Sequence, residues 1–179
     1  IQNNDKVGMI LFSDKVEKFI PPKKGRKHIL LIIREIINFV PENEGTDIDE
    51  ALRFLTNAIK KRTTAFLISD LIDSHDYSKS LTIANRKHDL ATIQVYDRRD
   101  AEMPDVGLVK MRDLETGQIA WIDTGSKNVR KMYAKAWYDR QQQISAVMAK
   151  SGVDMTSVTS DEDFVKALLG MFRRRSIAR

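Results

Sequence analysis

The 179-residue chain contains no cysteine, only three histidines and no long apolar run. Without cysteine, neither a disulfide framework nor a thiolate metal site can form, which excludes a small disulfide-stapled secreted scaffold. The longest fully apolar stretch, Ile29–Ile33, is far shorter than the roughly 20 residues that a membrane-spanning helix requires. The first residues also lack a basic segment followed by an apolar one, as a leader would have. We therefore expect a cytoplasmic protein with no membrane segment in this chain.

The residues that are present suit one ordinary globular domain. Hydrophobic residues make up 42% of the chain and charged residues 31%, which is enough apolar material for one sizeable core. The formal charge is +5, but the basic residues lie in short groups, such as Lys23–Lys27 and Arg173–Arg175. Few aromatic residues accompany these groups, and no nucleic-acid-binding motif does. We therefore expect no nucleic-acid partner.

Apolar runs and helical stripes alternate along the chain. Val7–Phe12 and Val16–Ile20 predict a hairpin that stops at Pro21–Pro22. Two further apolar runs, Ala65–Ile68 and Leu90–Tyr96, predict buried parallel strands joined by a helical crossover. Leu108–Arg112 and Ile119–Ile122 flank Glu115–Gly117 and predict a hairpin at the far edge of the sheet. Apolar residues at helical spacing predict the helices, in the segments Ile29–Ile36, Ile48–Ile59, Tyr77–Ala84, Val129–Met148 and Phe164–Phe172.

This order of elements predicts an α/β fold, with a Rossmann-like, doubly wound, mainly parallel sheet flanked by helices. Ligands of such sheets bind beyond the carboxyl ends of the strands, so polar residues directly after the strands are the candidates for a site. Oxygen ligands dominate the set, and they suit a hard cation such as Mg²⁺. The candidates are Ser13–Asp14, Gly45–Asp47, Ser69–Asp70 with Asp73, and Asp97–Arg99.

Each candidate also has a purely structural interpretation. Thr46 or Asp47 could serve only to cap the helix that begins at Ile48. Asp70 follows a buried strand, where an unpaired charge is costly, so we expect a metal, a water or a cation beside it. Asp73 is interpreted as a helix cap. The histidines lie in or beside charged segments and are interpreted as solvated or locally bonded; they are His28, His75 and His88.

Four segments carry a resemblance to a known family: NDKVGMILFSD, EGTDIDEAL, TTAFLISDLID and HDLATIQVYDRRDAEMPDVGLVKMRD. They resemble the von Willebrand factor A-like (vWA) proteins that are often encoded beside MoxR-type AAA+ ATPases. More narrowly, the chain is similar to the bacterial family of unknown function numbered fifty-eight, in which the vWA domain forms the C-terminal part of a longer protein. The resemblance implies that residues 1–179 form a single vWA-like domain.

The resemblance also implies a metal-ion-dependent adhesion site (MIDAS) that binds Mg²⁺ or Mn²⁺ in the intact protein. Such a site combines an Asp-x-Ser-x-Ser loop, a threonine and a later aspartate. Thr46 matches the threonine, whose hydroxyl binds the cation directly or through water. Asp70 matches the aspartate, which is usually an outer-shell ligand. The Asp-x-Ser-x-Ser loop does not occur in this chain, so the site is expected to be incomplete here.

The missing loop implies a missing strand. In the family's sheet this first strand is central, between the strands predicted at Val7–Phe12 and Ala65–Ile68. Without it, two apolar edges would face water, which is unstable. We therefore expect a fragment of a longer protein, or else a chain that closes its sheet, swaps strands or forms a homodimer through the exposed sheet edges.

Two functions are compatible with these residues. The first is a metal-dependent protein-interaction module, in which a cation with an open coordination position captures a carboxylate of a partner. The family context implies that the partner is a MoxR-type AAA+ ATPase or its client, with a role in assembling or remodelling protein complexes. The alternative is an Mg²⁺-dependent hydrolase or phosphoryl-transfer enzyme that uses Asp70 and Asp73. No catalytic constellation or phosphate-binding loop supports the alternative.

Overall fold

The computed structural model describes residues 5–43, 45–112, 117–159, 161 and 163–177. They form two compact units, the first from Ile1–Lys60 with Asp73–Tyr77 and the second from Lys61–Ile72 with Ser78–Arg179. No helix in these described ranges is both long and apolar enough to cross a membrane.

The elements in chain order are β1 (Val7–Phe12), β2 (Val16–Lys23), α1 (Arg26–Asn38), α2 (Ile48–Ala58), β3 (Thr64–Ser69), α3 (Ser78–Lys87), β4 (Asp89–Tyr96), α4 (Arg98–Ala101), β5 (Leu108–Arg112), β6 (Ile119–Asp123), α5 (Lys127–Ser151), β7 (Asp154–Thr159) and α6 (Phe164–Ile177).

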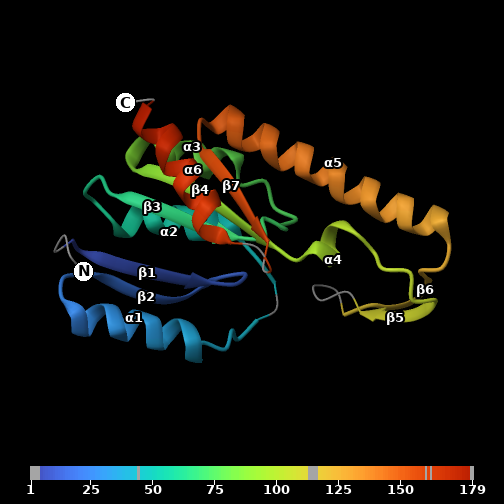
Figure 1. Cartoon of the computed structure of the whole chain (residues 1–179). Coiled ribbons are helices and arrows are strands. Elements are labelled where there is room, and N and C mark those ends of the chain that lie inside the picture. The colour runs from blue at the N-terminus through green and yellow to red at the C-terminus, as the bar shows by residue number, and fades with distance from the viewer. Residues whose placement is uncertain (1–4, 44, 113–116, 160, 162, 178–179) are drawn as a thin grey trace. The chain divides into compact units, whose positions relative to one another are not determined.

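The first unit is built on the antiparallel hairpin of β1 and β2, with α1 running along it (Figure 1). The predicted hairpin is confirmed, with Met9 opposite Ile20. Strand β2 continues through Pro21–Pro22 to Lys23, so the predicted stop at the prolines is wrong. Prolines are tolerated there because the β1–β2 ladder is irregular between Val7 and Met9, opposite Pro21–Pro22, and because β2 has one unpaired edge in the described sheet. Gly25, with φ 104°, then turns the chain into α1.

The two helices of the first unit bury different amounts of their apolar surface. In α2 the predicted stripe is buried at Ile48 and Leu52, and Phe54 packs edge-on against Phe19 of β2 with ring centroids 5.3 Å apart. In α1 only Ile32 is buried. Ile33 and Ile36, which the helical spacing assigned to the same core stripe, are exposed. Apolar side chains therefore extend around more of the circumference of α1 than the hairpin covers.

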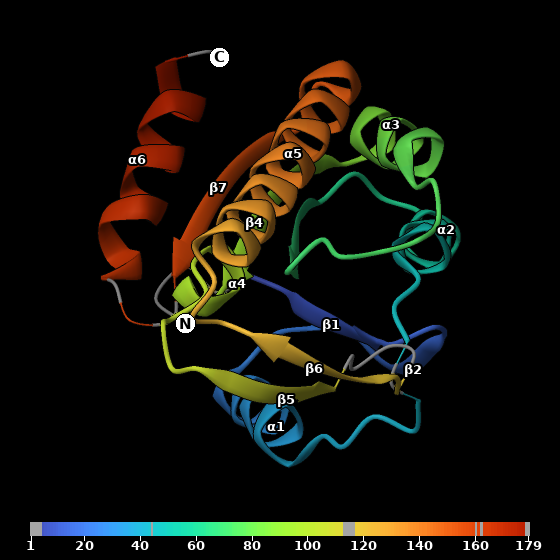
Figure 2. The same ribbon diagram turned by 90° about the vertical axis from the view of Figure 1, so that its right-hand side faces the viewer.

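The second unit contains a three-stranded parallel sheet in the order β3-β4-β7. The β3–α3–β4 succession confirms the predicted crossover, and the unit is an α/β arrangement of a parallel sheet flanked by helices. Leu67 lies opposite Thr92 and Phe66 opposite Ala91. Thr92 contacts Met148 of α5, whereas Phe66 contacts Phe172 of α6 with ring centroids 6.0 Å apart. Because neighbouring strand residues alternate in direction, α5 and α6 cover opposite faces of the sheet (Figure 2).

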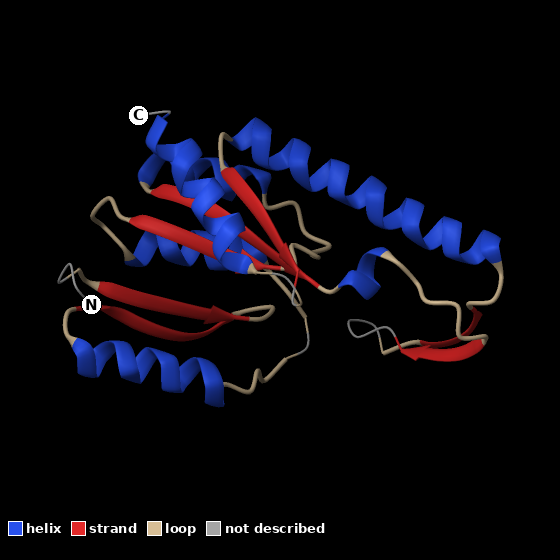
Figure 3. Cartoon of the chain, viewed as in Figure 1, coloured by secondary structure: helices blue, strands red, loops and turns tan. Residues whose placement is uncertain are grey.

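Three features of the second unit differ from the expectations. Strand β3 is less buried than predicted, since Phe66 and Ile68 are exposed. Strands β5 and β6 pair with each other as predicted, but they form a separate two-stranded sheet and do not extend the parallel one (Figure 3). Their predicted turn at Glu115–Gly117 lies largely outside the described residues. Strand β7 has no counterpart among the predicted elements.

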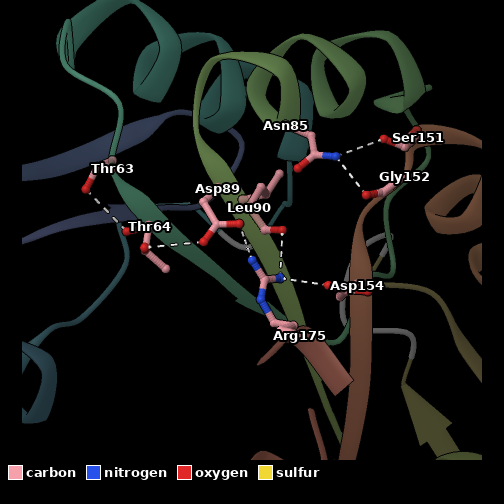
Figure 4. Close-up of polar contacts among 9 residues, drawn as sticks. All are labelled: Thr63, Thr64, Asn85, Asp89, Leu90, Ser151, Gly152, Asp154 and Arg175. Carbon is pink, nitrogen blue, oxygen red and sulfur yellow. Dashed lines mark hydrogen bonds and ion pairs between the residues drawn. The ribbon is translucent and has the colours of Figure 1, made fainter. Parts of the chain in front are cut away.

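Arg175 fastens α6 to the parallel sheet (Figure 4). Its guanidinium donates to the carboxylate of Asp89, which begins β4, and to Asp154, which begins β7, at 3.0 Å. It also donates to the backbone carbonyl of Leu90 at 3.3 Å. One side chain therefore joins the last helix to the first residues of two neighbouring strands.

Candidate metal centre

Polar loops of the first unit meet where β1 ends. The backbone N–H of Asp47 donates to the carbonyl of Ser13 at 2.8 Å, which ties the loop after β1 to the start of α2. A Cβ atom added at Gly45 would lie 3.3 Å from Cβ of Asp14, so glycine permits this close approach. The structure thus places two of the predicted candidate segments, Ser13–Asp14 and Gly45–Asp47, side by side.

Asp47 is the N-cap of α2. Its Oδ1 accepts a hydrogen bond from the backbone N–H of Glu50 at 2.8 Å. Of the two candidate caps, Asp47 therefore supplies the capping side chain. Thr46 is half-buried, and its backbone carbonyl accepts a hydrogen bond from the His75 ring.

Asp73 completes the start of α2 from a distant part of the chain. Its side chain is 0% exposed, and its Oδ2 accepts the backbone N–H of Ile48 at 2.7 Å. Its Oδ1 accepts the backbone N–H of His75 at 2.8 Å and lies 2.8 Å from the ring Nδ1 of the same residue. The prediction that Asp73 is a helix cap is confirmed, although the helix that it caps is α2 and not the one that follows it in sequence.

His75 supplies positive charge to this cluster. The pKa of His75 is raised above its usual value, mainly by the hydrogen bond and charge of Asp73, with smaller contributions from the charge of Asp47 and the Thr46 carbonyl. Each of Asp47, Asp73 and His75 offers one potential ligand atom, and these three atoms lie within 4.8 Å of one another. In the protonated form the imidazolium offsets one of the two carboxylate charges, and a metal ion bound here would compete with the proton on His75.

Asp70 lies in the second unit, in a setting unlike the predicted one. It is exposed, so the expectation of a costly buried charge is wrong; the strand before it, β3, is the edge of the described sheet. Its Oδ1 accepts the backbone N–H of Ile72 at 3.0 Å, and its carbonyl accepts from the Gln94 amide at 3.2 Å. The next residue, Leu71, is buried with φ 64°, a strained conformation for leucine. That Thr46 and Asp70 share one ion stays a prediction.

The remaining candidates have structural roles. Asp97 and Asp100 form a capping box around the short helix α4. The Asn43 amide donates to Asp14 at 2.8 Å and holds the pKa of that carboxyl below its usual range. The Ser13 hydroxyl donates to Glu17 within the β1–β2 turn.

The histidines fall into two classes. His75 is locally bonded as predicted, to Asp73 two residues earlier. The His28 ring contacts the Val7 carbonyl at 2.8 Å, and this partner lies 21 residues away in sequence. His88 is neither solvated nor locally bonded: its side chain is 0% exposed, and neither ring nitrogen has a hydrogen-bond partner among the described residues. The prediction for His88 is therefore wrong, because the folded chain buries a residue that the charged local sequence indicated to be on the surface.

The donor set agrees in kind with a hard cation. Thr46 offers a hydroxyl, and Asp70 offers a carboxylate oxygen for which no hydrogen bond is found within the described part of the chain. Mg²⁺ prefers about six oxygen ligands in octahedral geometry, several of them waters. Two protein ligands would leave most positions to water or to groups outside this chain. The residues therefore fit the chemistry of such an ion but do not complete its coordination.

The fold has counterparts among solved structures. The chain is similar to the conserved hypothetical protein BatB from Bacteroides thetaiotaomicron, with a TM-score of 0.54, 16% identity, and coverage of 98% of this chain and 80% of that one. It is also similar to an aerotolerance-related membrane protein from Bacteroides fragilis, with a TM-score of 0.54 and 15% identity over 96% of this chain and 80% of that one. These similarities support the α/β fold alone.

The sequence identifies the family. Residues 1–143 match the family described as protein of unknown function DUF58, and the chain belongs to it. It is 24% identical to the uncharacterized protein Rv1480 of Mycobacterium tuberculosis over 90% of this chain and 51% of that protein. It is 25% identical to the uncharacterized protein MAV169 of Mycobacterium avium over 87% of this chain and 93% of that one. The chain thus spans about half the length of the M. tuberculosis relative.

Proposed function

We propose that the chain is part of a vWA-like, metal-dependent protein-interaction module, in which Thr46 and Asp70 contribute to a MIDAS-type site for Mg²⁺ or Mn²⁺. The cation keeps an open coordination position, and a carboxylate of the partner protein fills it. The partner is a MoxR-type AAA+ ATPase or its client, and the module acts in the assembly or remodelling of protein complexes. The ATPase partner rests on the family resemblance.

The observation that carries this proposal is the division of roles at the start of α2. Asp47 and Asp73 together satisfy the backbone N–H groups of Glu50 and Ile48. The Thr46 side chain is therefore not needed as a cap, and the described residues provide its hydroxyl with no hydrogen bond. A hydroxyl with no hydrogen bond among the described residues is available as an oxygen ligand for a hard cation.

The strand arrangement supports the vWA-like part of the proposal. Among the described strands, β1 pairs only with β2, and β3 pairs with one neighbour, β4. Each therefore has a free edge where an additional strand could pair. The M. tuberculosis relative has about as many residues outside the matched region as inside it. We propose that the central strand and its Asp-x-Ser-x-Ser loop belong to a part of the protein outside these 179 residues.

The alternative enzyme would need both Asp70 and Asp73 at a reacting group. Asp73 has a 0% exposed side chain, and both its oxygens already accept hydrogen bonds from Ile48 and His75. Releasing it would uncap α2 and leave donors unpaired, which costs free energy. The geometry therefore favours the interaction module.

The test is partner capture by the intact protein with and without divalent metal. We expect Mg²⁺ or Mn²⁺ to promote pull-down of the ATPase, chelation to reverse it, and Thr46→Val or Asp70→Ala to abolish the metal effect. Asp5→Ala, a change at another exposed aspartate, is the matched control. Metal-independent capture that survives both substitutions would refute the proposal. Turnover of phosphate esters that Asp70→Ala abolishes would favour the enzyme instead.

A further inference from the structure

Helix α1 has an outer apolar face that no described residue covers. Leu30, Ile33, Ile36 and Ile37 are 53%, 47%, 55% and 75% exposed, and their spacing places them on one continuous arc of the helix. The side of α1 that packs on the hairpin carries His28 and Glu35, which bond the Val7 carbonyl and Lys18, and Ile32, which is 8% exposed, lies beside them. From Leu30 to Ile37, at 1.5 Å per residue, the outer face extends over about 10 Å of the 13-residue helix.

A group of basic residues lies at the beginning of the same helix. All four are exposed, and none makes an ion pair with a described residue: Lys23, Lys24, Arg26 and Lys27. Arg26 and Lys27 occupy the first turn, where the helix dipole disfavours positive charge, and Gly25 provides no capping side chain. These residues do not stabilise α1, so their placement calls for an anionic partner.

The outer face itself carries no carboxylate. The single acidic residue of α1, Glu35, lies on the side of the hairpin and pairs with Lys18 of β2 at 2.5 Å. Arg34 is exposed and adds a further positive charge to the polar side of the helix. The exposed surface of α1 is therefore aliphatic between Leu30 and Ile37, with cations at the beginning of the helix and Arg34 beside the aliphatic face.

We propose that α1 is an interfacial helix that docks this protein onto an anionic lipid surface. The aliphatic side chains enter the boundary between headgroups and acyl chains, the helix lies parallel to the membrane plane, and Lys23–Lys27 contact the lipid phosphates. The β1–β2 hairpin stays on the water side, where the His28 ring holds the helix through the Val7 carbonyl.

The combination of groups favours lipid over other partners. A nucleic acid would use the cations but has nothing to cover four exposed aliphatic side chains. Protein interfaces are centred on aromatic and arginine residues in fitted pockets, whereas the outer face of α1 consists of aliphatic side chains and has no aromatic residue. An anionic bilayer matches both features at once.

The absence of cysteine provides a site-specific readout. The full 179-residue chain carrying Ile37→Cys, labelled with a polarity-sensitive dye, is mixed with phosphatidylcholine vesicles containing an increasing fraction of phosphatidylglycerol. We expect a blue shift that grows with the anionic fraction and diminishes with salt. Ile83→Cys, at a 45% exposed position of α3, is the labelled control and should not shift.

Vesicle co-sedimentation of unlabelled protein separates the two contributions. Replacing Ile33 and Ile37 by serine should weaken binding by at least about tenfold, and each glutamine in place of Lys23, Lys24, Arg26 or Lys27 by about fivefold. Lys60→Gln with Lys61→Gln is the matched control for charge. Circular dichroism checks that each variant is folded.

Three outcomes would overturn the proposal. The first is equal binding to neutral and anionic vesicles, and the second is binding that neither set of substitutions changes. The third is a dye shift at Ile37→Cys that appears without vesicles and grows with protein concentration, because a second copy would then cover the face. Loss of binding in both α1 variants but not in the controls would support the lipid surface.

Discussion

His88 and His75 carry the same side chain in opposite electrostatic settings. His88 lies between α3 and β4 with no exposed surface, and burial lowers its pKa. His75 bonds Asp73, and its pKa is raised. A buried neutral histidine costs stability when the unfolded chain can take up a proton, whereas a histidine paired with a carboxylate gains stability from its proton. The contributions of His88 and His75 to the free energy of unfolding should therefore depend on pH in opposite directions.

Replacing His88 with leucine should stabilise the protein. The substitution removes two buried nitrogen atoms that lack hydrogen-bond partners among the described residues, and it changes the side-chain volume little. We expect the free energy of unfolding to rise by about 1 to 3 kcal/mol in urea denaturation at neutral pH. His28→Leu, which removes the bond to the Val7 carbonyl, should lower it instead. A less stable His88→Leu variant would contradict this assignment.

The same variant tests the pH dependence. Because the pKa of His88 is lower in the folded state, the wild type should lose stability as pH falls through the ordinary histidine range, where only the unfolded state is protonated. His88→Leu should lack this loss. The measurement is a series of urea denaturations on the acid side of neutrality, and an unchanged pH slope would count against a buried neutral His88.

Asp73 and His75 form the complementary case. The contribution of His75 is fully present below its unfolded pKa and is lost as pH rises through its raised folded pKa. Asp73→Asn should bring the pKa of His75 back toward its usual value, as followed by NMR titration of the ring protons. It should also lower the free energy of unfolding by about 1 kcal/mol, since the charged partner of the α2 N-terminus is lost. Asp5→Asn serves as the control, and an unchanged His75 titration would contradict the contact.

At the scale of elements, one side chain joins α6 to the ends of two strands. Arg175 joins the helix to the first residues of β4 and β7 and is only 13% exposed. Arg175→Ala should lower the free energy of unfolding by about 2 kcal/mol and should accelerate amide hydrogen exchange in α6. Arg174→Ala removes an exposed neighbour and should change stability by less than about 0.5 kcal/mol. Equal effects of the two substitutions would show that the ion pairs do not hold α6.

The elements also show what the sequence can predict. Strands β1 and β3 are mostly apolar, and β4 is rich in apolar and β-branched residues, so their pattern alone locates them. Strand β7 was missed because it places polar residues in the sheet: the Ser157 hydroxyl bonds the Gln94 amide oxygen on the neighbouring strand at 3.0 Å. That partner comes from a distant segment, so no local pattern reveals it. Asp73 is comparable, because its helix starts at Ile48, 25 residues earlier in the chain.

At the scale of the whole molecule, free sheet edges are the main departure from a self-sufficient fold. A parallel strand is normally buried on both faces between neighbours. In β3, Phe66 and Ile68 are 42% and 59% exposed, and they project to the same face of the sheet as α6, since Phe66 contacts Phe172. The sequence of β3 has the apolar composition of an internal strand, as predicted. In the described sheet, however, β3 pairs with β4 alone and has no neighbour on its other side.

Such an edge should drive association of this chain in isolation. We expect the 179-residue chain to self-associate with rising concentration in analytical ultracentrifugation, because exposed apolar edge strands pair with other chains. Ile68→Lys should suppress this association, since a charge at an edge strand opposes pairing with a second copy. Ile83→Lys, on an exposed position of α3, should leave it unchanged. If the wild type stays monomeric at all concentrations, or if both lysine variants dissociate equally, the edge of β3 is not the contact. Suppression by Ile68→Lys alone would locate the association at that edge, the position where the proposed central strand of the longer protein would pair.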